Sequence, residues 1–392
     1  MPKLADKSQC TGCTACASIC PRQCIQMKKD DAGFEFPEVI EQSACIACGA
    51  CERICPVLAN KKTEESHSST FAYAAFSIND SLRMESSSGG VFSELAVVIL
   101  QLGGIIYGAS YDDEGVVRHT GIEAQKELGK LRGAKYSQSI LGDSFLTLKK
   151  QLDSGRTVLF SGTPCQVAGL RAFLKRDYDN LVCIDFVCHG IPSPMVWEKY
   201  VRYRSQIDNG DMFPQHINLR NKESGWSNYA YSVEFTYADN TRYLCKNGDD
   251  PFMRLFVNDY ILRESCSNCH FKGYKRVSDI TLGDFWGIWN IDPEMDDDKG
   301  TSLILTHTAK GENMMNAVAG NIKCERVTLE QAVNRNPSML KSSEPKPNRD
   351  IVLKTIECET FQAVLPLLQV KPSKRRNKKE IIKNAFKKLC GL

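Results

Sequence analysis

The sequence predicts a protein of the α+β or α/β class in two parts, a small cysteine-rich module followed by a larger mixed α/β domain. Three observations support this prediction. Nine of the 18 cysteines lie in the first 55 residues, and a polar stretch follows at residues 61–70. From residue 71 onward, short apolar runs alternate with segments of helical periodicity, a pattern typical of a sheet covered by helices.

The composition is that of a folded globular chain. Of its 392 residues, 42% are hydrophobic and 25% are charged, so the chain can bury a core without disulfide bonds. The first residues are polar and lack the apolar segment of a signal peptide, and no apolar run is long enough to span a membrane. We therefore expect a cytoplasmic protein whose many thiols bind metal.

The net charge of +3 is unevenly distributed. Residues 371–392 hold nine Lys or Arg and one Glu, so this tail contributes +8 and the rest of the chain is acidic. An acidic body argues against nucleic acid as a partner. The tail places Ile381, Ile382, Phe386 and Leu389 on one helical face; we expect a solvated tail, with weak contact to an anionic membrane surface as the alternative.

The predicted elements follow in order along the chain. Strands are expected at residues 71–78, 104–109, 157–160, 181–187 and 279–282, with helices at 91–102 and 166–176 and a hairpin at 231–243. The alternation predicts a mostly parallel sheet. The expected division is a cysteine module at 1–60, a linker at 61–70, the α/β domain at 71–345, a C-terminal extension at 346–370 and a basic amphipathic tail at 371–392.

The cysteine module contains one motif twice, 35 residues apart. Cys10-x2-Cys13-x2-Cys16-x3-Cys20-Pro21 returns as Cys45-x2-Cys48-x2-Cys51-x3-Cys55-Pro56. In this spacing three cysteines hold one 4Fe-4S cluster and the fourth holds the other. The first predicted ligand set is therefore Cys10, Cys13, Cys16 and Cys55, and the second is Cys45, Cys48, Cys51 and Cys20.

Zinc explains this spacing less well, because zinc sites usually use paired CxxC knuckles. Cys24 falls outside the motif and is expected to be a free thiol. Residues 5–58 resemble the bacterial two-cluster ferredoxins, which implies one-electron transfer.

Ligands of open α/β sheets bind beyond the carboxyl ends of the strands, and unusual residues stand at several such ends here. These include Cys165 in a Gly-Thr-Pro-Cys-Gln turn, Cys188 and His189 in a Cys-His-Gly loop, and Asp284 in a Gly-Asp-Phe-Trp-Gly segment. Cys266 and Cys269 form a CxxC pair. Together, the four thiols Cys165, Cys188, Cys266 and Cys269 are candidate ligands of a third 4Fe-4S cluster.

Several alternatives remain open at these positions. The CxxC pair also suits zinc or a redox dithiol. Asp284 is a candidate catalytic acid or a non-thiolate ligand, and His189 is a candidate proton donor or a structural histidine. Trp226 and Trp286 suit either a ring-binding pocket or the core.

Two loops are candidate anion sites because each precedes a predicted helix. The first contains Gly162 and Thr163, and the second is Ser86–Gly90. Neither loop matches a Rossmann or Walker fingerprint, so any dinucleotide would be held in another way.

Over residues 70–345 the sequence resembles the family of the coenzyme F-420 hydrogenase/dehydrogenase β subunit. The resemblance rests on an ordered set of motifs: Ser88-Gly89-Gly90, Arg132 to Ser139, Gly162 to Gln166, Cys188-His189-Gly190, Cys266 with Cys269, and Gly283 to Gly287. It implies an FAD-binding domain with an iron–sulfur cluster beside the flavin. The residues that it implies for FAD contact are Ser88, Gly89, Gly90, Lys135, Tyr136, Gln138 and Ser139, and it implies the four later cysteines for the third cluster.

The resulting hypothesis is an iron–sulfur flavoprotein oxidoreductase. It would relay electrons between ferredoxin-type clusters and a two-electron small-molecule substrate through FAD, with His189 and Asp284 as candidate catalytic residues. The resemblance leaves coenzyme F-420 and other compounds open as substrate, including a role in surface-polysaccharide metabolism, and implies a ferredoxin-like or hydrogenase-like partner. The alternatives are an electron-transfer subunit that feeds a partner enzyme and a zinc-stabilised interaction protein.

Overall fold

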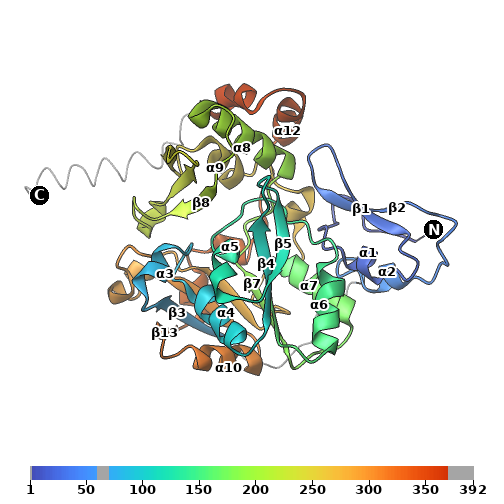
Figure 1. Ribbon diagram of the computed structural model, residues 1–392, viewed down its shortest axis with the longest axis horizontal. Helices are drawn as coiled ribbons and strands as arrows, with labels where there is room; N and C mark the ends of the chain where they lie inside the picture. The colour runs from blue at the N-terminus through green and yellow to red at the C-terminus, as the bar shows by residue number, and fades with distance from the viewer. Residues whose placement is uncertain (1, 60–69, 370–392) are drawn as a thin grey trace, which may run out of the picture.

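The computed structural model describes residues 2–59 and 70–369. The N-terminal module consists of α1 (Ala15–Ile19), a hairpin of β1 (Ile25–Lys29) and β2 (Glu35–Val39), and α2 (Ala50–Arg53). The internal repeat is visible in the backbone, because Thr14 and Gly49, which precede the two helices, are both left-handed. The module lies against one side of the larger domain (Figure 1).

The larger domain is built on an eight-stranded sheet of order β13-β3-β12-β11-β7-β6-β4-β5. The strands are β3 (Phe71–Ser77), β4 (Ile105–Tyr111), β5 (Val117–Ile122), β6 (Val158–Ser161), β7 (Leu181–Phe186), β11 (Ile280–Asp284), β12 (Ser302–Thr306) and β13 (Ile322–Val327). Only the central strands β4, β6, β7 and β11 are parallel, and the others join antiparallel.

The prediction of a mostly parallel sheet is therefore wrong at both edges. β4 returns directly into β5, and β11 pairs antiparallel with β12. Neither connection contains the crossover helix that a parallel neighbour needs. The parallel centre remains, and its carboxyl ends carry the candidate site residues.

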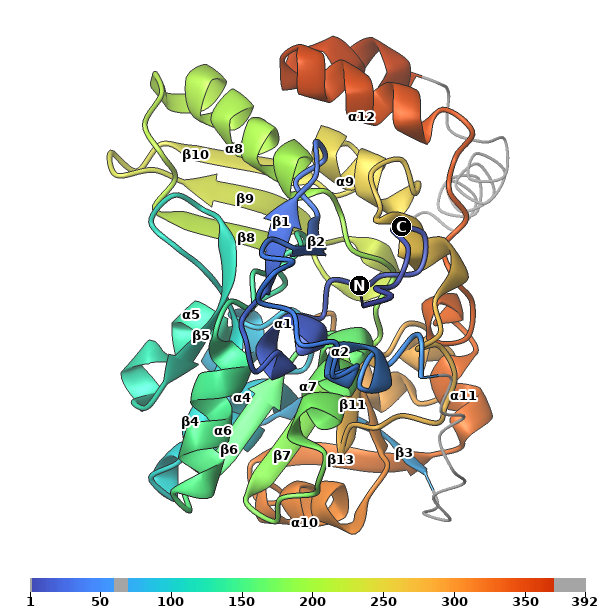
Figure 2. The ribbon, with the colours of Figure 1, turned by 90° about the vertical axis from the view of Figure 1, so that its right-hand side faces the viewer.

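Helices cover both faces of the sheet. They are α3 (Asp80–Met84), α4 (Val91–Gln101), α5 (Leu128–Leu131), α6 (Ser144–Asp153), α7 (Pro164–Leu174), α10 (Ala309–Ala317) and α11 (Leu329–Val333). α4, α5 and α10 bury their apolar side chains on one face, and α6 and α7 bury theirs on the other. In Figure 2 the N-terminal module stands in front of α7.

A second layer of structure lies above the carboxyl ends of the sheet. It contains α8 (Pro194–Asn209), a three-stranded sheet of β8 (His216–Asn221), β9 (Ser232–Thr236) and β10 (Arg242–Lys246), α9 (Pro251–Val257) and α12 (Arg349–Cys358). The predicted hairpin is β9–β10. Figure 1 shows α12 beside α8, so the expected C-terminal extension covers this layer.

Short 3-10 segments connect these elements. They are η1 (Gln125–Glu127), η2 (Ser227–Tyr229), η3 (Glu264–Asn268), η4 (Ile288–Asn290), η5 (Pro293–Met295), η6 (Pro337–Met339) and η7 (Phe361–Gln369). Within residues 2–59 and 70–369, no helix is both long and apolar enough to cross a bilayer. The predicted basic tail, and the predicted linker apart from Thr70, lie outside the described residues.

Candidate functional site

The predicted ligands of the first cluster lie together although they come from both motifs. Cys10, Cys13, Cys16 and Cys55 border one small cavity, which Cys51 also reaches. Burial, together with the smaller effect of the charges of Cys10, Cys165 and Cys55, raises the pKa of the Cys13 thiol to about 12. Cysteines of both motifs therefore lie around one cavity, and the exchange of cluster ligands between the motifs stays a prediction.

The second set gathers around Cys24, the thiol outside the motif. Cys20, Cys45 and Cys51 pack with Cys24, whose Sγ atom lies 3.4 Å from that of Cys20. Cys24 is buried, whereas Cys48 is exposed. Within the part of the chain that the structure describes, no three His, Cys, Asp or Glu side chains form a group that could hold a single metal ion.

The four later cysteines also converge. Cys165 stands in the first turn of α7, Cys188 follows β7, and Cys266 and Cys269 lie in and just after η3. Burial raises the pKa of the Cys188 thiol, Lys272 lowers it, and the charges of the other three thiols raise it further. Burial is the main cause that raises the pKa of the Cys266 thiol to about 12, and the charges of the Cys165 and Cys269 thiols also raise it.

Local hydrogen bonds explain how the three segments hold these thiols. Thr163 caps α7 in a reciprocal capping box with Gln166, and its Oγ1 atom lies 3.1 Å from the Cys165 Sγ atom. The backbone N–H of Ile191 donates to the Cys266 Sγ atom at 3.3 Å. Because the capping box occupies the N–H of Gln166 and Pro164 has no N–H, the Gly162–Thr163 turn has few donors left for a phosphate.

The first cluster site and the four-thiol site are neighbours through α7. Gly169 of α7 lies so close to Cys13 that an added Cβ atom would stand 2.7 Å from the Cys13 Cβ atom and 2.9 Å from its Sγ atom. α1 packs on α7, as Figure 2 shows. Cys13 and Cys165, one from each site, interact electrostatically.

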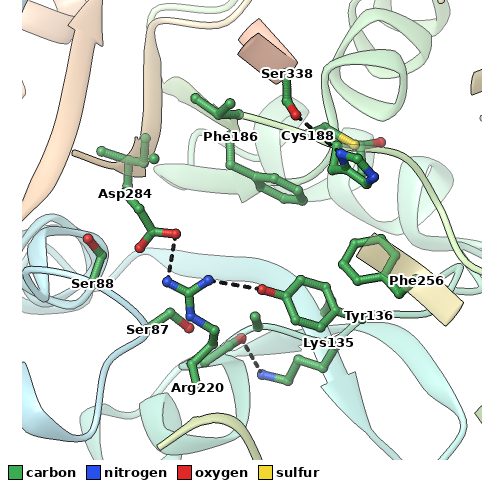
Figure 3. A pocket seen from close by; sticks show the side chains of 18 of the residues that line it. Ser87, Ser88, Lys135, Tyr136, Phe186, Cys188, Arg220, Phe256, Asp284 and Ser338 are labelled. Carbon is green, nitrogen blue, oxygen red and sulfur yellow. Dashed lines mark hydrogen bonds and ion pairs between the residues drawn. The ribbon is translucent and has the colours of Figure 1, made fainter. Parts of the chain in front are cut away.

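A cavity of about 1370 Å³ opens at the carboxyl ends of the parallel strands, beside the four-thiol site. Two of the four thiols, Cys165 and Cys188, line it. The predicted FAD contacts and catalytic residues on its wall are Ser88, Gly90, Lys135, Tyr136, Gln138, Ser139, Gly162, Thr163, His189 and Asp284. Phe186, Tyr136 and Phe256 give one part of the wall an aromatic surface (Figure 3).

Gly89 differs from the other predicted contacts, because it does not line the cavity. A Cβ atom on Gly89 would stand 2.4 Å from the Ala75 carbonyl oxygen, so this glycine allows the loop to pack on β3. The neighbouring Gly90 has φ of 84° and starts α4 from a left-handed conformation. Ser87 lies in the same loop, and its buried hydroxyl has no hydrogen-bond partner.

Asp284 is part of an ion pair that the sequence did not reveal. Its Oδ2 atom lies 2.7 Å from Nη2 of Arg220, and Nη1 of Arg220 donates to the Tyr136 hydroxyl at 3.3 Å (Figure 3). The guanidinium also stacks over the rings of Tyr231 and Trp286. Arg220 comes from β8 of the upper layer, so no local pattern connects it with Asp284.

His189 is held at both ring nitrogens. Its Nε2 atom lies 2.7 Å from Asp259 Oδ1, and its Nδ1 atom lies 3.2 Å from Ser338 Oγ. Phe256 packs edge-on against the ring. The imidazole lines the cavity with a fixed orientation, which suits either of the two roles considered for it.

Three of the other predicted contacts have distinct partners. Lys135 donates to the Arg132 carbonyl, and burial lowers its pKa to about 7. Ser139 bonds to His119 and Gln166, and Gln138 bonds to the backbone of Glu35 and to Arg263.

Trp226 is fully buried and stacks on Trp286. Of these two tryptophans, only Trp286 lines the cavity.

Comparison with known proteins gives matches for both parts. Residues 9–59 match the 4Fe-4S dicluster domain, and residues 155–331 match the C terminus of the coenzyme F420 hydrogenase/dehydrogenase β subunit. No protein of curated function matches the sequence significantly. Among solved structures, a chain of the xenon-derivatised F420-reducing [NiFe] hydrogenase complex from Methanosarcina barkeri aligns with 15% identity and a TM-score of 0.45, over 76% of this chain and 92% of that one.

The later residues of this site, from Cys165 to Asp284, lie within the matched β-subunit segment, and the N-terminal cysteine motifs lie within the matched dicluster segment. The chain therefore combines an N-terminal 4Fe-4S dicluster domain with a segment that is similar to the C terminus of the coenzyme F420 hydrogenase/dehydrogenase β subunit.

Proposed function

We propose that this protein is an iron–sulfur flavoprotein oxidoreductase. In this proposal electrons pass between the two N-terminal clusters, a third cluster on Cys165, Cys188, Cys266 and Cys269, FAD, and a two-electron substrate. One observation carries the proposal: the four later thiols converge between the first cluster site and a large cavity. A cluster at this position would join the electron carriers of the module to the contents of the cavity.

The residues present fit a flavin. A volume of about 1370 Å³ exceeds the usual range of roughly 300–1000 Å³ for ligand pockets, which leaves room for a flavin and a small substrate. The buried Ser87 hydroxyl without a partner and the Lys135 ammonium are polar groups available to a dinucleotide. A bound flavin would supply the exchange between single electrons and electron pairs.

The chain's own residues have separate roles in this proposal. The loop of Ser88 and Gly90 and the Lys135 ammonium would bind the cofactor, and Tyr136 and Phe186 would exclude water from its ring. Arg220 would hold positive charge at the cavity wall, supported by Asp284. His189 would hold or move a proton at Nδ1 or Nε2 while Asp259 and Ser338 fix its orientation.

Anaerobic purification tests the proposal, with iron, acid-labile sulfide and flavin measured on one sample. Three cubane clusters require about twelve iron atoms per chain, together with one FAD. We expect the Cys188→Ser variant to keep about eight iron atoms and to lose reduction of its flavin through the N-terminal clusters. Cys245→Ser is the matched control, because Cys245 lies on β10 and does not line the cavity.

A wild-type protein with about eight iron atoms and no flavin would refute the proposal. Equal flavin reduction in Cys188→Ser and wild type would refute the relay alone. The substrate, coenzyme F-420 or another small molecule, and the redox partner protein would then be sought by assaying candidate carriers against the intact protein. A flavin that is reduced by the clusters but exchanges electrons only with another protein would favour the electron-transfer subunit over the enzyme.

A further inference from the structure

Arg263 is a buried arginine at the junction of the N-terminal module and the larger domain. Only 2% of it is exposed. It directly precedes η3, the segment that carries Cys266. Arg263 is not among the predicted site residues, because nothing in the local sequence distinguishes it from a surface arginine.

The guanidinium connects three distant segments. Its Nε atom donates to the Cys10 carbonyl at 2.8 Å, Nη2 donates to the Glu35 carbonyl at 3.0 Å, and Nη1 donates to Gln138 Oε1 at 3.0 Å. Two of these acceptors belong to the N-terminal module and the third lies on the cavity wall. The side chain also stacks over the Phe36 ring, 4.0 Å from its centroid.

The backbone of Arg263 forms hydrogen bonds within the four-thiol site. Its N–H donates to the Ile191 carbonyl at 2.8 Å, and its own carbonyl accepts from the N–H of Cys266 at 3.0 Å. Ile191 in turn donates to the Cys266 Sγ atom. One residue therefore touches the ligand loops of two different cluster sites.

The charge of Arg263 has no carboxylate to balance it at close range. All three side-chain hydrogen bonds go to neutral oxygens, and within the described residues no carboxylate lies at ion-pair distance from the guanidinium. Glu35 interacts with it electrostatically, but burial raises the pKa of that carboxyl. A buried cation without a counter-charge is costly, so an anion nearby would stabilise it.

The predicted ligands on both sides lie close to this charge. The guanidinium donates to the carbonyl of Cys10, and the backbone carbonyl of Arg263 accepts from the N–H of Cys266. A cluster held by four thiolates is negatively charged, and each added electron makes it more so.

We propose that Arg263 is the shared electrostatic support of the first N-terminal cluster and the third cluster. It would position the module against the larger domain and stabilise the reduced state of both clusters, which raises their reduction potentials relative to that of the second cluster. This inference rests on the proposed third cluster for one of its two halves. The half that concerns the first cluster rests only on the contacts of Arg263 with Cys10 and Glu35.

Redox titration of the intact protein, followed by electron paramagnetic resonance, tests the inference. In Arg263→Met, which keeps an unbranched apolar stem but removes the charge, we expect the potentials of the first and third clusters to become more negative while the second stays unchanged. Arg83→Met is the matched control, because Arg83 is also fully buried over an aromatic ring but is paired with Asp297 away from the thiols. We expect no shift of any cluster in that control.

Glu35→Gln provides a test of opposite sign and does not depend on the folding of Arg263→Met. The contacts of Glu35 with Arg263 and Gln138 use its backbone, so this variant keeps them. The titration is made at a pH well above the raised pKa of the Glu35 carboxyl, where the variant removes only an acidic charge. We expect the first cluster's potential to become more positive in Glu35→Gln and to stay near the wild-type value in Arg263→Lys. Unchanged potentials in Arg263→Met with full iron content, or no positive shift in Glu35→Gln, would overturn the inference.

The two proposals fail in different ways. A wild-type iron content of about eight atoms per chain would remove the third cluster and the proposed relay. The shift of the first cluster in Arg263→Met and Glu35→Gln would still be expected. If instead all three clusters are present and none responds to these variants, the role of Arg263 is refuted and the relay is not.

Discussion

The contact between Gly169 and Cys13 makes the Gly169→Ala variant a sharp test of how the module is coupled to the larger domain. An added methyl would stand 2.7 Å from the Cys13 Cβ atom, 2.9 Å from its Sγ atom and 3.1 Å from its carbonyl oxygen. The optimal separation of carbon atoms is about 3.5–4.0 Å, so Cys13 must move by about 1 Å. Rotation of the Cys13 side chain moves only its Sγ atom and leaves its Cβ atom and carbonyl oxygen in place. Side-chain rotation alone therefore cannot relieve the overlap.

Two contributions of opposite sign determine the stability of Gly169→Ala. Alanine in the interior of α7 gains roughly 1 kcal/mol of helix propensity over glycine. Overpacking at a tight contact costs about 1–3 kcal/mol. We therefore expect α7 and its sheet to remain folded, with a loss of up to about 2 kcal/mol confined to the contact between module and domain.

Stopped-flow reduction is the assay, with rates of cluster and flavin reduction compared at equal iron and flavin content. We expect Gly169→Ala to keep its cofactors, to show an altered spectrum of the first cluster and to reduce its flavin several-fold more slowly. Gly129→Ala is the control, since a Cβ atom on Gly129 of α5 would meet nothing within 4 Å. Equal flavin reduction rates in both variants and wild type would refute the reasoning that electrons leave the module across this contact.

Three further predictions follow from buried groups. Trp226→Ala should lose about 3–5 kcal/mol of unfolding free energy in urea, because the indole is fully buried on Trp286; a loss below 1 kcal/mol would contradict its place in the core. Burial lowers the pKa of Lys135 to about 7, so FAD affinity should fall as pH rises above 7, where the neutral amine must first take up a proton; Lys135→Met should bind FAD weakly with no such pH dependence. Burial also lowers the pKa of His119 to about 4, below its ordinary 6.5, so its contribution to stability is present above pH 6.5 and is lost as pH falls toward 4; His119→Gln should flatten that part of the stability profile in urea.

Sequence reasoning succeeded where chemistry is encoded in local spacing. The cysteine motifs specify short turns, and the 35-residue repeat appears as the equivalent left-handed residues Thr14 and Gly49. The rule that ligands bind at the carboxyl ends of parallel strands placed Cys165 and Cys188 on one cavity. Each of these predictions rested on short local patterns of the sequence.

Predictions failed or were absent where the decisive partner is distant in the chain. The antiparallel edges of the sheet depend on which strands meet, and short apolar runs do not determine this. Arg220 and Asp284 are 64 positions apart, and Arg263 reaches Cys10 across 253 positions. The contact of Gly89 with FAD stays a prediction, and its close packing on β3 is a feature that the sequence did not reveal, because a glycine required by backbone packing has the same sequence signature as one that faces a ligand.

The distribution of the thiols along the chain has a consequence for how the protein is made. All ligands predicted for the first two clusters are present once residue 55 has been synthesised, and they lie within one small module. The four-thiol site instead needs three segments, the last of which follows β8, β9 and β10, and it is incomplete until residue 269 has joined the fold. Since N-terminal units generally fold first during synthesis, the clusters of the proposed relay would be assembled in two episodes, early in the module and late in the interior.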